Sequence, residues 1–283
     1  MSLRLAYNTN GTQNHRLEDA LELIAEAGYD GVALTLDVHH LDPFAPNLQA
    51  RAAELSRRLT RLNLGCVIET GARYLLDPRA KHEPTLVTPN AAGRARRVDF
   101  LCRAIDVAAI CGAEAVSLWA GVARVQRATA WPWLVAGLRE VLEHARRCEV
   151  TVAVEPEPGM LIDTVDDFEC LAGEIEGLTL ALDTGHCLVT GEHDPAAAVH
   201  RFAGRLGTVA IEDMRRGEHL HLPFGEGDMD VAAVLGALEE IGFGGLVCVE
   251  LSRDSHRAHT MVAEAYAALR AATAAPRGRA AAG

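Results

Sequence analysis

Lysine is almost absent from this sequence of 283 residues, and several other features are missing with it. Lys81 is the only lysine, and the excess of acidic residues leaves a formal net charge of −12. That balance excludes a nucleic-acid or anionic-membrane surface, because both need a positive field. No apolar run reaches the roughly 18 residues of a membrane span, and no basic and then apolar leader opens the chain. We therefore expect a cytoplasmic protein with a small-molecule partner.

Paired cysteines and a phosphate-binding glycine loop are also missing. The seven cysteines are odd in number and widely spaced, with no C-x-x-C pair, which predicts buried thiols. The segment "NTNGTQNH", after the first predicted strand, contains one glycine and no G-x-G-x-x-G motif. An open doubly wound sheet usually carries such a loop at this point. Its absence favours a closed barrel over the open sheet.

Short apolar runs alternate with segments of helical period along nearly the whole chain. The predicted strands are 3–8, 31–36, 65–69, 115–119, 151–155, 178–183, 207–212 and 245–251. Glycines end several helix-to-strand turns, as in "EAGYDGV" and "EIGFGGLV". Eight βα units without a linker predict an α/β fold, a single-domain (β/α)8 TIM barrel over 1–271. The tail, 272–283, is rich in small residues and is predicted to be disordered.

Acidic residues end five of the predicted strands: Glu69, Glu155, Asp183, Glu212 and Glu250. The C-terminal ends of barrel strands form the active-site rim, so these carboxylates are expected to meet there. Carboxylates held together repel one another, and a divalent cation relieves that repulsion most simply. The alternative is that some acids cap helices, as we expect of Asp166 or Asp167 in "DTVDDF".

Three histidines can join these acids. His186 follows Asp183 by three residues in "LDTGH". His219 and His221 alternate in "GEHLHL", so they face the same side if this loop is extended. Carboxylates with one or two imidazoles suit Mn²⁺, Zn²⁺, Fe²⁺, Co²⁺ or Mg²⁺. The sequence therefore predicts a site for one divalent metal, with Mn²⁺ or Zn²⁺ favoured.

Other side chains beside the strand ends are candidates for substrate contact. Arg73 and Lys81 follow the third predicted strand and Arg215 follows the seventh, where each could meet a substrate anion. Trp119, at the end of the fourth strand, and Tyr74 either wall a sugar ring or pack in the core.

A second group of arginines has a different expected place. The helical run "AGRARRVDF" contains Arg94, Arg96 and Arg97. We expect these three to form a solvated helix face, because charged side chains are seldom fully buried.

Five segments carry a family resemblance: "ETGARYLLDPRAKHEPTL", "AVEPEPGM", "LDTGH", "IEDMRRGEHLHLPFGEGDMD" and "VCVELSRDSH". Together they resemble the sugar isomerase/epimerase superfamily with a xylose-isomerase-like barrel, and more narrowly its bacterial sugar-phosphate isomerase/epimerase members. The resemblance covers nearly the whole chain up to the tail. It implies an enzyme acting on a polyol with a bound divalent metal.

The resemblance also implies roles for particular residues. Glu155 and Glu250 match the glutamates that bind the metal and, in the epimerases, exchange protons with the two faces of the carbon beside a carbonyl. Asp183 matches a metal ligand, and His186 matches a histidine that contacts substrate. His221, with His219 as its partner, resembles a ligand of an additional metal in the related apurinic-site endonucleases. Glu69 is a further candidate for substrate contact.

One family ligand is missing from this sequence. The superfamily usually has a histidine three positions before the acid of the seventh strand, in a pattern like V-H-x-x-D. Counting back from Asp213 leads to Ala210, which cannot bind a metal. Glu212 lies two residues after Ala210 and so on the same face of a strand. Glu212, a loop histidine or water is left to complete the metal shell.

The chemistry that such a site performs follows from its charges. Removing a proton beside a carbonyl gives an enediolate, which a metal stabilises, while two carboxylates serve as base and acid. This favours an isomerase or epimerase acting on a sugar, sugar phosphate or cyclitol. The same groups could expel a hydroxyl, so a lyase or dehydratase acting on a keto-polyol is an alternative. Ala210 also leaves open a binding barrel that has lost catalysis, and homo-oligomerisation stays open.

Overall fold

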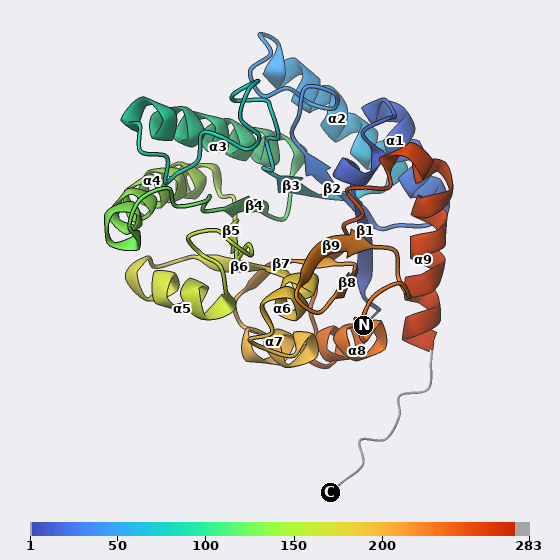
Figure 1. Ribbon diagram of the computed structural model, residues 1–283. Coiled ribbons are helices and arrows are strands. Elements are labelled where there is room, and N and C mark those ends of the chain that lie inside the picture. The colour runs from blue at the N-terminus through green and yellow to red at the C-terminus, as the bar shows by residue number, and fades with distance from the viewer. Residues whose placement is uncertain (1, 275–283) are drawn as a thin grey trace, which may run out of the picture.

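Eight parallel strands close into a barrel in the order β1–β10–β7–β6–β5–β4–β3–β2, as the sequence predicts. The computed structural model describes residues 2–274, and Figure 1 shows the helices arranged around the strands. The barrel strands are β1 (Arg4–Asn8), β2 (Gly31–Thr35), β3 (Gly65–Glu69), β4 (Val116–Trp119), β5 (Val152–Glu155), β6 (Thr179–Asp183), β7 (Leu206–Ile211) and β10 (Leu246–Val249). Each lies within about two residues of its predicted bounds.

The surrounding helices also follow the predicted alternation. They are α1 (Leu17–Ala27), α2 (Leu48–Leu62), α3 (Ala91–Cys111), α4 (Arg127–Cys148), α5 (Val165–Glu174), α6 (Thr184–Thr190), α7 (Pro195–Arg201), α8 (Val231–Glu240) and α9 (Ala258–Ala274), with short 3-10 turns η1 (Thr9–Thr12) and η2 (Ser255–Arg257). Leu17, Leu21 and Ile24 bury one face of α1, and Gly28 ends that helix with a φ of +100°. A left-handed residue at this place lets the chain turn into β2.

Two predictions near helix ends need correction. Thr164, not Asp166 or Asp167, caps α5, because its hydroxyl accepts the backbone N–H of Asp167. Both aspartates lie in the first turn, where their negative charges interact favourably with the positive end of the helix dipole. Helix α9 continues through Ala274, so the first three residues of the predicted tail are helical and 275–283 lie outside the described residues.

The core has two parts. Side chains on β1, β2, β3 and β10 form a separate cluster of Ala6, Ala33, Val67, Leu246 and Cys248. These positions alternate along the strands with residues of the larger core, so the cluster fills the barrel interior while the larger core lies between strands and helices. None of the helices within 2–274 is both long and apolar enough to cross a bilayer.

The predicted burial of the cysteines and the predicted exposure of the arginines on α3 are each wrong for at least one residue. All seven cysteines are free, and Cys66, Cys187 and Cys248 are buried as predicted, but Cys170 is exposed on α5. Arg97 was expected on a solvated face and is instead fully buried on α3. Its guanidinium stacks on the indole of Trp119, an interaction between distant segments that helical periodicity does not report.

The segment 213–222, after the seventh barrel strand, forms a β-hairpin that the sequence did not predict. β8 (Asp213–Arg215) and β9 (Glu218–Leu222) pair antiparallel, directly after β7. The carboxylate of Asp213 anchors the segment beyond the hairpin by accepting the backbone N–H groups of Gly225 and Met229. The hairpin lies against α6 (Figure 1) and supplies His219 and His221 from β9.

Candidate active site

A cavity of about 640 Å³ lies at the carboxyl ends of the barrel strands. Its lining includes the acids Glu69, Glu155, Glu157 and Glu250, the histidines His186, His219 and His221, the cations Arg73, Lys81 and Arg253, and the aromatic residues Tyr74 and Trp119. The predicted rim therefore exists as one cavity, with Asp183 and Glu212 buried beside it. Arg215 lies elsewhere: it is exposed on β8, near Glu218, and does not line this cavity.

Asp183 connects the barrel to helix α6. As the residue before α6, it accepts the backbone N–H groups of Gly185 and His186 through Oδ1, at 2.8 and 3.1 Å. This cap fixes both the carboxylate and the start of the helix that carries His186. Oδ2 is buried 3.3 Å from His186 Nε2 and has no hydrogen-bond partner within 2–274. Burial opposes the charge, but the facing histidines outweigh it and lower the pKa of Asp183.

Glu212 completes a buried triad with Asp183 and His221. It is fully buried after β7, and neither carboxylate oxygen has a hydrogen-bond partner in the described chain. His221 Nδ1 lies 4.0 Å from Glu212 Oε2 and is also buried without a partner. One donor atom from each of the three residues lies within 4.8 Å of the others. Burial and the charge of Asp183 raise the pKa of Glu212.

The glycine at 185 is explained by Glu212. A Cβ at that position would clash with Glu212 Oε1, so any side chain there would displace the carboxylate. Ala210, where the family histidine is missing, pairs in register with Asp183 on β6 and Cys248 on β10. Position 210 is therefore in the same layer of the barrel as Asp183. Glu212 follows two residues later along the chain.

The histidines form a second layer over these acids. His186 is buried, and its Nδ1 lies 2.9 Å from the carbonyl oxygen of Pro156. A carbonyl only accepts, so Nδ1 carries a proton. Nε2 lies 3.1 Å from Nε2 of His219 on β9. Glu157, His186 and His219 offer a further group of three donors within 4.8 Å.

The two predicted acid/base residues enter the cavity from different sides. Glu155 ends β5, and Glu250 follows β10, with the two strands β6 and β7 between them around the barrel. Glu155 Oε1 lies 3.8 Å from His186 Nδ1, and burial, reinforced by Glu157, raises the pKa of Glu155 well above its usual range. Glu250 accepts N–H groups from Asn10 at 2.8 Å and Asn8 at 3.4 Å. These amides orient its carboxylate.

Sequence reasoning missed Glu157, Asn8 and Asn10. Glu157 stands two residues after Glu155 in "EPEP", an alternation that places both on the cavity, and this signal was available. Asn8 ends the first strand and Asn10 lies within η1, and only the closure of β1 onto β10 brings them to Glu250. Glu69 lines another wall of the cavity. Burial, and then the charge of Glu250, raise the pKa of Glu69.

Comparisons with known proteins agree with the barrel. The L-ribulose-5-phosphate 3-epimerase of Shigella flexneri serotype 5b is 24% identical over 247 residues, covering 82% of this chain and 81% of the epimerase. The inosose dehydratase of Lacticaseibacillus casei is 26% identical over 148 residues, covering 46% of this chain and 49% of the dehydratase. The chain thus spans about half the length of that relative.

A solved structure extends the likeness to the fold. The IOLI protein with a bound zinc atom superposes with a TM-score of 0.72 at 19% identity, covering 96% of both chains. The sequence model of the xylose isomerase-like TIM barrel matches residues 21–272. With the closed barrel and the acid-lined rim, this match shows that the chain belongs to the xylose isomerase-like TIM barrel family.

Proposed function

We propose that this protein is a divalent-metal-dependent isomerase or epimerase acting on a sugar, sugar phosphate or cyclitol. The observation that carries the proposal is the placement of Glu155 and Glu250 on one cavity, separated around the barrel by β6 and β7. Two carboxylates that approach from different directions can remove a proton from one face of a carbon and return it to the other. The two related proteins named above act on a ketose phosphate and an inosose.

The two glutamates have different surroundings, which suits different roles. Burial raises the pKa of Glu155, which suits this residue to act as an acid, whereas two amide N–H groups orient the Glu250 carboxylate for the role of base. His186 and Glu157 close the cavity on the Glu155 side. Glu69, at the end of β3, lines another wall of the cavity.

The residues present fit a divalent metal. Four buried polar atoms have no hydrogen-bond partner in the described chain: Asp183 Oδ2, both carboxylate oxygens of Glu212 and His221 Nδ1. Unpaired polar atoms in the interior cost free energy unless something binds them. Carboxylates and imidazole suit Mn²⁺ or Zn²⁺. Asp183, Glu212 and His221 would hold the ion, with Glu155 and Glu250 at its open side. When bound, the metal would stabilise the negative charge that develops on two adjacent substrate oxygens.

A cationic edge of the cavity favours a substrate with an anionic group. Arg73 and Lys81 come from the loop after β3, and Arg253 from the loop after β10. Arg73 donates to Gln13, while the next residue, Asn14, is hydrogen-bonded to Ser255 beside Arg253. These contacts tie the two loops to the same segment. Among the three substrate classes, this edge favours a sugar phosphate, because guanidinium and ammonium groups bind phosphate oxygens.

One further activity has specific support. The relative from Lacticaseibacillus casei is an inosose dehydratase, and elimination of water beside a ketone needs the same acid and base. A dehydratase acting on a keto-polyol is therefore the second candidate.

Solvent-deuterium exchange tests the proposal. Manganese- or zinc-loaded protein is incubated in deuterium oxide with a ketopentose phosphate, a free ketohexose and an inosose. The wild type is expected to incorporate deuterium at the carbon beside the carbonyl of an accepted substrate, and Glu155→Gln or Glu250→Gln should slow this by about 10²–10⁴-fold. Glu26→Gln, at an exposed position on α1, is the control and should be unchanged.

Three results would contradict the proposal. Full incorporation by both cavity variants would remove the acid/base assignment. No exchange and no elimination by the metal-loaded wild type, with ligand binding intact, would favour a binding barrel. Release of water from the inosose without deuterated epimer would favour the dehydratase.

A further inference from the structure

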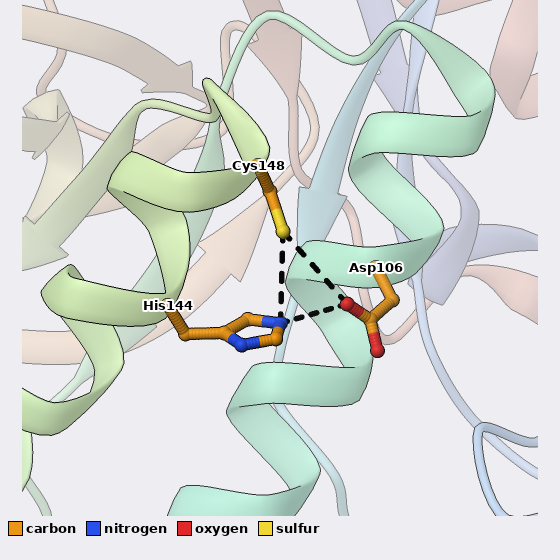
Figure 2. A group of neighbouring side chains, drawn as sticks. All are labelled: Asp106, His144 and Cys148. Atoms are coloured by element: carbon orange, nitrogen blue, oxygen red, sulfur yellow. Dashed lines mark hydrogen bonds and ion pairs between the residues drawn. The ribbon is translucent and has the colours of Figure 1, made fainter.

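Three metal-binding side chains meet outside the candidate active site, between helices α3 and α4. Asp106 lies near the C-terminal end of α3, and His144 and Cys148 lie on the last turns of α4. Figure 2 shows the three side chains directed toward one another from the two helices. In a (β/α)8 barrel the helices run back against the strands, so their C-terminal ends lie at the face opposite the strand C-termini. This cluster is therefore remote from the candidate active site.

The three donor atoms lie close enough together to share one ion. His144 Nε2 lies 2.7 Å from Asp106 Oδ1, and Cys148 Sγ lies 3.7 Å from His144 Nε2 and 3.9 Å from Asp106 Oδ1. A triangle with these sides has a circumscribed radius of about 2 Å, close to zinc–nitrogen and zinc–oxygen bond lengths and shorter than the zinc–sulfur bond of about 2.3 Å. For an ion to bind all three atoms, the hydrogen bond between Asp106 and His144 must open and the thiol must move outward.

A hydrogen-bonded relay explains the arrangement less well. In a relay, the histidine would contact the acid through one ring nitrogen and the thiol through the other. Here Nε2 faces both Asp106 and Cys148 (Figure 2). Three donors that converge on one point, instead of forming a chain, are typical of coordination.

The donor types select the metal. One thiolate, one imidazole and one carboxylate form a mixed soft and borderline set, which suits Zn²⁺ and its substitutes Co²⁺ and Cd²⁺ and disfavours Mg²⁺, Ca²⁺ and Mn²⁺. We propose that Asp106, His144 and Cys148 form a second metal site, which binds zinc-type ions with three protein ligands and one open position. The metal would clamp α3 to α4.

The helices hold this site in place and leave it accessible. His144 and Cys148 are four residues apart, so they share one face of α4, and Asp106 faces them from a neighbouring helix. The side chain of Asp106 is 49% exposed and that of His144 is 23% exposed, so an ion can enter from solvent. A cavity of about 710 Å³ is lined in part by Asp106 and His144.

Arg147 opposes binding and provides a test. Its Nη2 lies 3.3 Å from His144 Nδ1, which makes Nδ1 the acceptor and leaves the proton on Nε2. A metal on Nε2 requires the proton on Nδ1, so Arg147 must turn away. Its side chain is 61% exposed and can do so. Removing it should remove both the competing hydrogen bond and a repelling charge.

Cobalt titration of the full chain tests this site. Co²⁺ bound to a thiolate gives an ultraviolet charge-transfer band that the oxygen and nitrogen donors of the barrel site do not give. The wild type is expected to show a band of one thiolate, which Cys148→Ser removes. His144→Gln and Asp106→Asn should weaken cobalt affinity about tenfold or more, and Arg147→Ala should strengthen it. Cys102→Ser and Cys170→Ser, on α3 and α5, are matched controls that keep the band.

Zinc binding supplies a second measurement. Zinc should raise the melting temperature of Asp183→Asn, in which the barrel site is weakened, and should raise that of Asp183→Asn with Cys148→Ser much less. Absence of a thiolate band in the folded wild type, or its survival in Cys148→Ser, would overturn the proposal. Both measurements are independent of enzyme activity, so their failure is distinguishable from failure of the proposed function.

Discussion

The guanidinium of Arg97 lies over the indole of Trp119, with Cζ 4.3 Å from the ring centroid, and its Nη2 donates to the carbonyl of Thr70 at 2.9 Å. Trp119 lines the candidate active site, and Thr70 begins the loop that follows β3. Arg97 is fully buried, and burial lowers its pKa to about 9. It therefore acts from α3 as a positioning residue for one wall of the cavity.

Replacing Arg97 by methionine should change substrate binding more than folding. The lost hydrogen bond to Thr70 is offset by removal of a buried, incompletely paired cation, so the free energy of unfolding should change by less than about 2 kcal/mol. Trp119 loses its stacking partner, so KM should rise about tenfold while kcat changes little. Steady-state kinetics and the indole NMR signal of Trp119 check this. Arg96→Met, exposed on the same helix, is the control. An unchanged KM with an unchanged indole signal would remove the positioning role.

Metal affinity at the barrel should depend on Glu212 and His221. Glu212→Gln and His221→Asn should each weaken binding of Mn²⁺ or Zn²⁺ about tenfold or more, because each removes a donor from the buried triad. Ala210→His in the Glu212→Gln background should restore affinity, since position 210 pairs in register with Asp183. Calorimetric titration in a Cys148→Ser background isolates the barrel site. Affinity that is insensitive to all three changes would locate the metal elsewhere.

Lys81, the only lysine in the sequence, should make the protein bind phosphorylated substrates more tightly than the matching free sugars. Lys81→Met is expected to raise KM for a ketose phosphate about tenfold and to leave KM for the matching free ketose within about twofold, because only the former has an anion to pair. Arg79→Met changes a nearby exposed cation that does not line the cavity and serves as the control. Equal effects on both substrates would contradict the phosphate assignment.

His82 should remain neutral in the folded protein to unusually low pH. Burial, followed by the nearby cations Lys81, Arg97 and Arg73, lowers its pKa from 6.5 to about 4. The unfolded chain therefore binds a proton here between pH 6.5 and 4 that the folded chain does not, so this contribution to stability is complete above pH 6.5 and is lost as pH falls toward 4.

An NMR titration of the His82 ring, together with unfolding curves at pH 7 and pH 4.5, measures this effect. His82→Asn should make the loss of stability between these pH values smaller. His259, which is exposed on α9, provides the control substitution. A His82 midpoint near 6.5 in the folded protein would contradict the expected shift.

The candidate site was predictable where function follows from strand position. Parallel strands in a barrel end at one rim, so Glu69, Glu155, Asp183 and Glu250 had to converge once the alternation of strands and helices was recognised. The alternation in "GEHLHL" likewise predicts that His219 and His221 face the same side, and both line the cavity. Arg215 shows the limit, because its position after a strand did not determine the direction of its side chain.

The sequence by itself determined the barrel and its strand ends, because hydrophobic period and residue order are local properties of the chain. Only the tertiary structure decided which acid stands near the vacant position, that Arg97 is buried against Trp119, and that Asp106 meets His144 and Cys148. Those contacts join segments that are distant in sequence. They depend on how helices and loops pack around the closed barrel, which no local pattern specifies.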